Sequence, residues 1–289
     1  MNQIKKEAKT FGLIVDSTCT ISDKELKNED IIKVPLTIYF NSDAHLDGTV
    51  SVDMLIAAFN EDVDIKTSQP TPDAFLQAMN TQLKTYDHVI VLSLAKTLSG
   101  TYNSAILAKD LCENPEKITV IDTESTGAGT LYFVEQLTKL RSEGGSFQEA
   151  VKLAEDIKKR NVFYITVDNL KYLIKGGRIT RVKAMIGNVL KKKPILKFKE
   201  GTLGLDATVR SFVGVKNYIV EQAKKILESG KEKVVVYINY VDDESRATAM
   251  KEALSELGEK VYIRIVGLVS PVVSAHVGLG TLGICIVEE

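Results

Sequence analysis

The sequence predicts an α/β fold with two domains, a parallel α/β/α domain over residues 1–160 and a mixed-sheet α+β domain over residues 161–289. The first observation is the length of 289 residues, which suits two domains of about 100–200 residues each. The second is the alternation of apolar runs with capped helices in the first half, a pattern typical of parallel sheets. The third is a hairpin pattern around Glu200-Gly201-Thr202, which favours a mixed sheet in the second half.

The expected strands of the first domain are short apolar runs rich in β-branched residues. The helices between them are predicted from their N-caps, among them the capping boxes Ser22 with Glu25 and Ser146 with Glu149. Strands are expected at residues 11–15, 31–40, 88–94 and 118–121, a loop at 66–72, and helices from Ser22, Ser51, Thr71, Gly100, Gly127 and Ser146.

The second domain is expected to mix both kinds of element. Residues 266–287 contain no Asp, Glu, Lys or Arg, yet Pro271 and the glycines argue against a membrane-spanning helix, so we expect buried strands and turns there. Residues 278–283 match G-x-G-x-x-G, but too little chain follows for a βαβ unit, so we expect turns with close backbone approach. Strands are expected at 162–167, 194–199, 203–210, 233–240, 261–266 and 284–287, and helices before Gly176 and at 178–190, 213–228 and 242–257.

The composition argues against several classes of protein. Lys and Arg number 37 against 38 Asp and Glu, a formal net charge of −1, so attraction of the whole chain to nucleic acid or to an anionic membrane is not expected. The three cysteines lack metal-ligand spacing and favour a reducing compartment. The N-terminal segment is charged and is no signal peptide, so we expect a cytoplasmic protein.

One stretch departs from this charge balance. Residues 169–199 contain ten basic residues and no acidic one. A solvated helix face explains most of the lysines, whereas a docking face for an acidic protein or a phosphate is the functional alternative. Nucleic-acid binding is disfavoured because Tyr172 and Phe198 are the only aromatic residues in this stretch.

Polar residues follow three expected strands of the first domain, at the edge where parallel α/β sheets bind ligands. Hydroxyl-rich loops at Thr67-Ser68 and at residues 97–101 are expected beside them, and the second opens a helix. Hydroxyls and free N–H groups at a helix start can bind a small anion, while plain N-capping is the structural alternative. The strand ends are Asp16-Ser17-Thr18, Ser93 and Asp122-Thr123-Glu124.

Of the three histidines, His276 is the candidate for chemistry. It lies in the uncharged segment, where an imidazole needs a partner, either within the core or as a donor to an anionic or carbonyl ligand. His45 and His88 are interpreted as structural, and the three show no metal-ligand spacing. Ser99, His276 and Asp16 match no hydrolase motif, but triads are set by geometry rather than order. A serine hydrolase acting on lipid esters is therefore the alternative function.

Six short motifs occur in a fixed order along the chain. They are Asp16-Ser17-Thr18, Lys66-Thr67-Ser68-Gln69-Pro70, Leu98-Ser99-Gly100-Thr101-Tyr102, Asp122-Thr123, Gly176-Gly177-Arg178-Ile179 and His276-Val277-Gly278. Together they resemble the DegV family of bacterial fatty-acid-binding proteins over essentially the whole chain. Cys19-Thr20, where the family has a small residue and an acid, and Leu279, where it often has proline, depart from the pattern and leave local loop shape open.

The resemblance implies a Rossmann-like first domain and a long-chain fatty acid, such as palmitate, stearate or oleate, in a tunnel with its carboxylate held between the domains. It also implies that the chain is no enzyme, needs no cofactor or metal, and presents the acid to a separate ATP-dependent fatty-acid kinase that makes an acyl phosphate. By the same resemblance, the kinase docks near Arg178 and Arg210. The implied carboxylate contacts are Thr67, Ser99 and His276, with Ser68 and Gly100 adjacent.

Simple energetics agree in kind with such a ligand. Each buried CH₂ contributes about 0.8 kcal/mol, so a tail of about 16 carbons contributes on the order of 12 kcal/mol before binding losses. Neutral hydroxyl hydrogen bonds contribute about 1 kcal/mol each. We therefore expect the tail to set affinity, and Thr67, Ser99 and His276 to orient a carboxylate that meets no lysine or arginine. His276 would be a cationic or a strong neutral donor.

Overall fold

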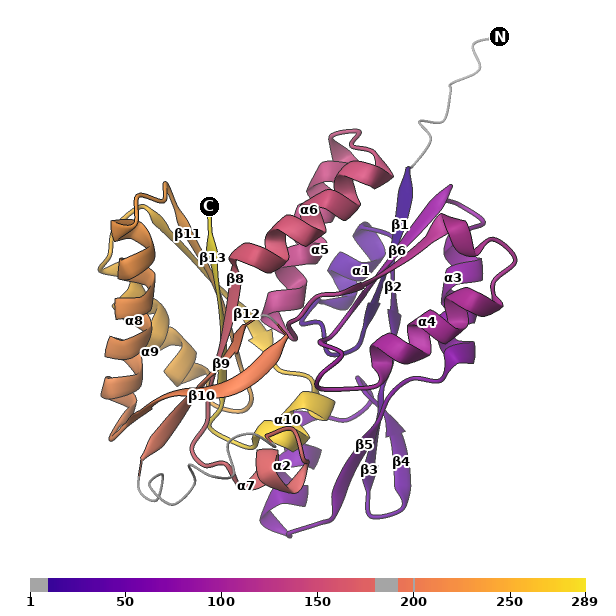
Figure 1. The fold of residues 1–289 in the computed structure, drawn as a ribbon. Coiled ribbons are helices and arrows are strands. Elements are labelled where there is room, and N and C mark those ends of the chain that lie inside the picture. The colour runs from indigo at the N-terminus through magenta and orange to yellow at the C-terminus, as the bar shows by residue number, and fades with distance from the viewer. Residues whose placement is uncertain (1–9, 180–191, 200) are drawn as a thin grey trace.

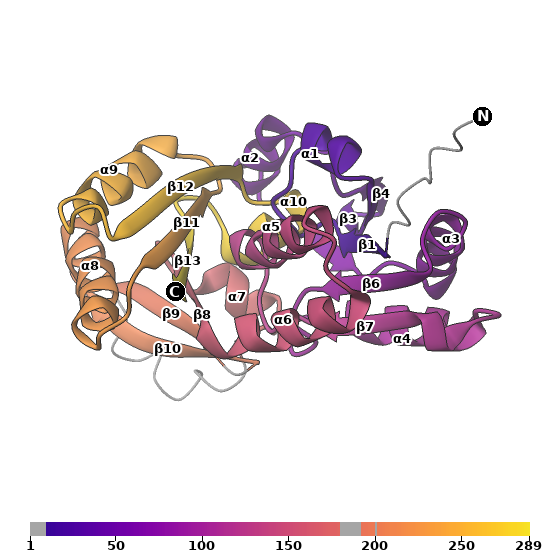
Figure 2. The ribbon, with the colours of Figure 1, turned by 90° about the horizontal axis from the view of Figure 1, so that it is seen from above.

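The computed structural model describes residues 10–179, 192–199 and 201–289, which form layers around two large β-sheets (Figure 1). The helix expected over residues 178–190 lies almost wholly outside the described residues. Helices α5 and α6 lie between the two large sheets, α3 and α4 cover the far side of the first sheet, and α8 and α9 cover the far side of the second (Figure 1 and Figure 2).

The first sheet is parallel and has the strand order β2-β1-β6-β7. Its residues alternate between two buried clusters, one against α3 and α4 and one against α5 and α6. The elements are β1 (Phe11–Asp16), α1 (Asp23–Asn28), β2 (Ile31–Val34), α3 (Pro72–Gln82), β6 (His88–Ser93), α4 (Thr101–Leu111), η1 (Pro115–Lys117), β7 (Ile118–Asp122), α5 (Ala128–Ser142) and α6 (Phe147–Arg160).

The second sheet is mixed and has the strand order β10-β9-β8-β13-β11-β12, with β11 and β12 paired in parallel and the other neighbours antiparallel. The fold class predicted from the sequence is therefore confirmed, the hairpin of β9 and β10 included. The elements are β8 (Asn161–Thr166), α7 (Lys171–Lys175), β9 (Lys193–Lys199), β10 (Thr202–Val209), α8 (Phe212–Glu228), β11 (Val234–Tyr240), α9 (Glu244–Ser255), β12 (Val261–Leu268) and β13 (Leu282–Glu288).

A third, three-stranded antiparallel sheet in the order β4-β3-β5 was not predicted. The run 31–40, expected as one strand, is divided between the first and third sheets because Pro35 follows β2 and has no N–H for the ladder. The expected loop at 66–72 begins inside an edge strand of the third sheet. The elements are β3 (Thr37–Phe40), β4 (Asp43–Leu46), α2 (Val52–Asn60) and β5 (Ile65–Ser68).

Residues 266–287 also differ from the expectation of strands and turns, because they include the helix α10 (Pro271–Val277). The Ser270 hydroxyl caps this helix by accepting from the Val273 N–H, and Pro271 occupies its first turn. The same signal at Thr71-Pro72 correctly predicted α3. Gly278 and Gly280 follow the helix with φ of +79° and +73°, so the G-x-G-x-x-G match is a turn leading into β13, as expected.

The boundary predicted near residue 160 falls between the end of α6 at Arg160 and the start of β8 at Asn161. One buried cluster crosses this point, because Leu13 of β1, Phe133 of α5 and Phe163 of β8 belong to it together. The division of the chain into two domains there stays a prediction.

Candidate functional site

The helix α10 brings His276 to the third sheet. Its residues Val272 and Ala275 are buried with Ile38 and Leu55 from the other end of the chain, and this packing turns the imidazole toward β5. The Nε2 atom of His276 lies 2.8 Å from the Thr67 hydroxyl oxygen, across 209 positions of sequence. Two residues expected at a common site are therefore in hydrogen-bond contact.

Asp47, just after β4, ties the start of α10 to the end of β1. Its carboxylate accepts from the Val272 N–H at 3.3 Å and from the Ser17 hydroxyl at 2.7 Å. Burial raises the pKa of Asp47 from 3.8 to about 6, against the opposing effect of these hydrogen bonds. No motif in the sequence links this carboxyl to His276.

The turn after α7 closes the other side of the imidazole. A Cβ atom on Gly176 would lie 2.4 Å from the Nδ1 atom of His276, so only glycine permits this approach. The Arg178 guanidinium donates to the carbonyls of Gly176 and, at 3.3 Å, of Leu98. Burial, and secondarily the charge of Arg178, lowers the pKa of His276 from 6.5 to about 4. The imidazole is therefore neutral near pH 7 rather than cationic.

Ser99 lies in the same cavity wall as Thr67 and His276, whereas Ser68 and Gly100 contact other residues. The Ser99 hydroxyl bonds to the Thr101 hydroxyl at 2.9 Å at the start of α4. Ser68 is 3.4 Å from the Tyr39 hydroxyl, and alternation along β5 places it on the opposite face from Thr67. Gly100 makes room for Gln69, whose side-chain oxygen would lie 2.4 Å from an added Cβ.

Cavities on the two sides of the Thr67–His276 pair share three wall residues, Thr67, Arg178 and His276. The outer cavity, of about 270 Å³, has charged residues such as Asp62 and Lys175 in its wall. The inner one, here called the throat, has a volume of about 50 Å³. The other wall residues of the throat are mostly apolar: Thr18, Leu36, Leu94, Leu98, Ser99, Thr126, Ile165, Leu173, Leu203, Val272, Val273 and Val277.

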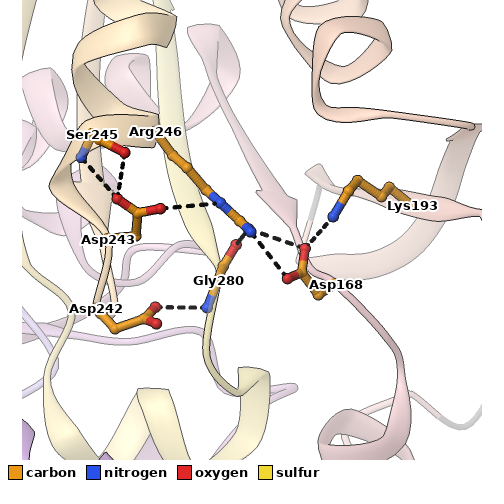
Figure 3. A network of polar contacts seen from close by, with 7 residues as sticks. All are labelled: Asp168, Lys193, Asp242, Asp243, Ser245, Arg246 and Gly280. Atoms are coloured by element: carbon orange, nitrogen blue, oxygen red, sulfur yellow. Dashed lines mark hydrogen bonds and ion pairs between the residues drawn. The ribbon is translucent and has the colours of Figure 1, made fainter.

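A polar network connects the segment just before α7 with the segment just after α10 (Figure 3). Arg246 of α9 binds the Asp168 carboxylate through two nitrogens, at 3.0 and 3.2 Å, and donates to the Gly280 carbonyl at 2.6 Å. Asp242 accepts from the Gly280 N–H at 2.6 Å, and Lys193 bonds to Asp168. Asp168 precedes α7 and Gly280 follows α10, so one cluster anchors the segments that carry Arg178 and His276.

The polar strand ends of the first sheet have partners within the protein. Asp16 is fully buried and accepts from the N–H groups of Thr18 at 2.9 Å and Leu94 at 2.6 Å. Asp122 accepts from the N–H groups of Lys96 and Glu124 at 3.2 and 3.0 Å. These carboxylates hold the loops that follow the strands.

The arrangement gives no support to hydrolase or metal chemistry. Ser99 pairs with Thr101, His276 with Thr67 and Asp16 with Thr18 and Leu94, so the imagined triad is not assembled. Within the described ranges, no cluster of His, Cys, Asp and Glu side chains suits a metal ion, and no helix has the length and hydropathy of a membrane span. His45 and His88 pack on the rings of Phe40 and Phe147.

These features define a class of protein. It is an α/β protein with a parallel and a mixed sheet, in which a hydroxyl, a neutral imidazole and a guanidinium meet where a cavity with charged residues in its wall adjoins a mostly apolar throat. Such a site suits an amphipathic ligand with an anionic head. The family model described as "Uncharacterised protein, DegV family" matches residues 10–289, and the chain belongs to the DegV family.

Known proteins agree with this assignment. A DegV domain-containing protein of Staphylococcus aureus is 29% identical, covering 96% of this chain and 98% of its own. A solved structure described as fatty acid binding of a DegV family protein from Thermus thermophilus has a TM-score of 0.89 and 26% identity, covering 97% of this chain and all of that one. A DegV lipid binding protein from Thermotoga maritima has a TM-score of 0.82 and 25% identity, covering 96% and 98% of the two chains.

Sequence reasoning missed two features of the site: Arg178 lines the cavity walls, and residues 271–277 form the helix α10. The family resemblance implies only a docking role for Arg178, and one arginine among ten basic residues gives no sign in the sequence that it lines a cavity. The Ser270-Pro271 pair was a usable signal for α10.

Proposed function

We propose that the chain binds a long-chain fatty acid, such as palmitate, stearate or oleate, with its carboxylate at Thr67, Ser99 and His276 and its tail in the throat. The observation that carries the proposal is the Thr67–His276 contact between a cavity with charged residues in its wall and a mostly apolar throat. The fatty-acid and lipid binding described for the Thermus and Thermotoga relatives supports it. Ser68 and Gly100 would support the head-binding loops from behind.

Arg178 changes the expected electrostatics of the carboxylate. We expected a carboxylate without a basic partner, but Arg178 lines the same walls as Thr67 and His276. A buried carboxylate needs a counter-charge or several donors. In the proposal, the guanidinium neutralises the head, and the neutral imidazole and the hydroxyls fix its orientation.

The tail would have to part the walls of the throat. Ligand pockets for molecules of this size are about 300–1,000 Å³, whereas the throat has about 50 Å³. In the proposal, its leucine and valine side chains move apart to admit the tail, and each methylene removed from water contributes about 0.8 kcal/mol. Tail length and opening of the throat are therefore coupled in this proposal.

The outer cavity supports presentation of the head to a second protein. It borders the head site through Thr67, Arg178 and His276 and has charged residues at its wall. We propose that a separate fatty-acid kinase reaches the carboxylate from this side and docks near Arg178 and the exposed Arg210. A carboxylate oxygen then attacks the γ-phosphorus of ATP and ADP leaves, which yields the acyl phosphate. The chain itself would act as a cytoplasmic carrier and supply no cofactor.

Native mass spectrometry of the protein purified from a bacterial host tests the binding step. We expect a bound mass equal to a long-chain fatty acid, and uptake of added palmitate or oleate after delipidation. A protein that is ligand-free and takes up neither acid would contradict the proposal. Addition of a fatty-acid kinase and ATP, with hydroxylamine trapping of the acyl phosphate, then tests presentation.

The serine hydrolase alternative has its own test. A fluorophosphonate probe should leave the protein unlabelled, because Ser99 is paired with Thr101 rather than with His276. Labelling of Ser99 that disappears in His276→Ala would instead favour the hydrolase.

A further inference from the structure

The throat continues into a small recess whose polar groups the fatty-acid proposal does not use. The recess shares Thr126, Ile165, Val273 and Val277 with the throat and extends to Asn239 of β11. Its volume is about 10 Å³, which is room for about one water-sized group. Most of the remaining wall is apolar or glycine.

Two polar atoms in this wall are buried without a partner among the described residues: the hydroxyl oxygen of Thr126 and the side-chain carbonyl oxygen of Asn239. Thr126 is 3% exposed and Asn239 is 1% exposed. Buried polar groups are nearly always hydrogen-bonded, and those that are not call for a missing partner. An apolar acyl chain cannot provide one.

The Asn239 side chain is held in a fixed orientation. Its amide nitrogen donates to the Thr20 hydroxyl at 3.1 Å. A Cβ on Gly127 would lie 2.6 Å from the amide nitrogen, and one on Gly283 would lie 2.2 Å from the amide oxygen. The amide therefore fits a slot between two glycines, and its oxygen is presented as an acceptor.

Resting on the proposed fatty-acid function, we propose that this recess is a second polar subsite, which selects long-chain fatty acids that carry a hydroxyl on the chain. The ligand hydroxyl donates to the Asn239 oxygen and accepts from the Thr126 hydroxyl. Because a hydroxyl is both donor and acceptor, one group satisfies both wall atoms. A hydroxyl at another carbon does not reach this pair and faces the mostly apolar wall of the throat.

The test measures dissociation constants for stearate and for a series of hydroxystearates with the hydroxyl at successive carbons. Wild type, Thr126→Val and Ser125→Ala are compared. Thr126→Val removes the hydroxyl and keeps the shape. Ser125→Ala is the matched control, because the Ser125 hydroxyl is also buried without a partner in the described chain but lines neither throat nor recess.

We expect one hydroxyl position to bind wild type at least as tightly as stearate, and the other positions to bind about tenfold more weakly. Thr126→Val should lower the ratio of hydroxystearate affinity to stearate affinity about fivefold, while Ser125→Ala leaves this ratio unchanged. If stearate binds but every hydroxystearate binds more weakly than stearate, the subsite is overturned and a water occupies the recess. If stearate, palmitate and oleate all fail to bind, the proposed function fails instead.

Discussion

Polar side chains gather in two regions of this protein, buried at the edge of the first sheet and half-buried at the junction of α7 and α10, and the two regions use them differently. At the carboxyl edge of the first sheet, Asp16 and Asp122 each accept hydrogen bonds from a backbone N–H of their own loop and from one in the loop after β6, at Leu94 and Lys96 respectively. At the junction of α7 and α10, Thr67 is in hydrogen-bond contact with His276, and both line the two cavities together with Arg178. Both regions look alike in sequence, as polar residues beside apolar runs.

The two regions differ in the partners that their hydrogen-bond donors and acceptors have. A carboxylate can only accept hydrogen bonds, so one that accepts from backbone N–H groups fixes loops and offers no donor to an anionic ligand. A hydroxyl or imidazole with one partner in the protein still has a site for another. Changes at the sheet edge should therefore lower the free energy of unfolding, and changes at the junction should lower ligand affinity.

The largest expected effect is that of Asp16→Ala at the sheet edge. The substitution leaves the N–H groups of Thr18 and Leu94 and the Thr18 hydroxyl without their acceptor in a fully buried place. We expect a loss of about 3–5 kcal/mol in the free energy of unfolding, measured by urea denaturation. Asp43→Ala removes an exposed carboxylate of β4 as control. Equal stability of the two variants would contradict the structural role.

The next effect concerns pH at the junction. His276 has a folded pKa of about 4 against 6.5, so the unfolded state binds more protons and acidification through this window destabilises the fold by up to about 3 kcal/mol. Asp47 has a folded pKa of about 6 against 3.8, so acidification from 6 to 3.8 stabilises the fold by a similar amount. In wild type the two contributions oppose each other.

Substitution of each residue in turn should separate the contributions of His276 and Asp47 to the pH dependence of stability. Relative to wild type, His276→Asn is expected to gain stability as the pH falls from 6.5 to 4, and Asp47→Asn to lose it over 6 to 3.8. Urea unfolding of the three proteins across this range provides the measurement, and differences from wild type remove the contributions of other carboxylates. Parallel pH profiles for all three would show that neither group titrates as assigned.

Sequence reasoning located the fold class and most helix starts because caps are local signals. Ser22, Ser51, Thr71 and Ser146 cap the helices predicted from them. The same local reasoning could not show that α10 packs on the third sheet, because that contact joins residues at opposite ends of the chain. Whether a polar residue faces a cavity or a loop N–H likewise depends on the tertiary structure. Asp16 accepts from loop N–H groups, whereas Thr67 lines two cavities.

Arginine variants sharpen the comparison inside the site. Arg178→Ala should weaken fatty-acid binding at least tenfold, since a charge-assisted hydrogen bond contributes about 1.5–3 kcal/mol. Arg210 is exposed, so Arg210→Ala should leave affinity unchanged and slow only phosphorylation by the kinase. Fatty-acid titrations and hydroxamate trapping measure the two properties separately. If Arg178→Ala binds fatty acid normally, its role is limited to the docking that the family resemblance implies.

Thr67→Val is the smallest of the expected effects and the most local. It removes the hydroxyl that faces His276 at 2.8 Å and keeps a β-branched side chain suited to β5. We expect affinity for the acid to fall about fivefold, as for one lost hydrogen bond, with little change in unfolding. Ser68→Ala is the matched control, because it removes the next hydroxyl along the same strand on the opposite face. Equal losses in both variants would mean that β5 acts through its backbone, and the assignment of the carboxylate to one face of the strand would be wrong.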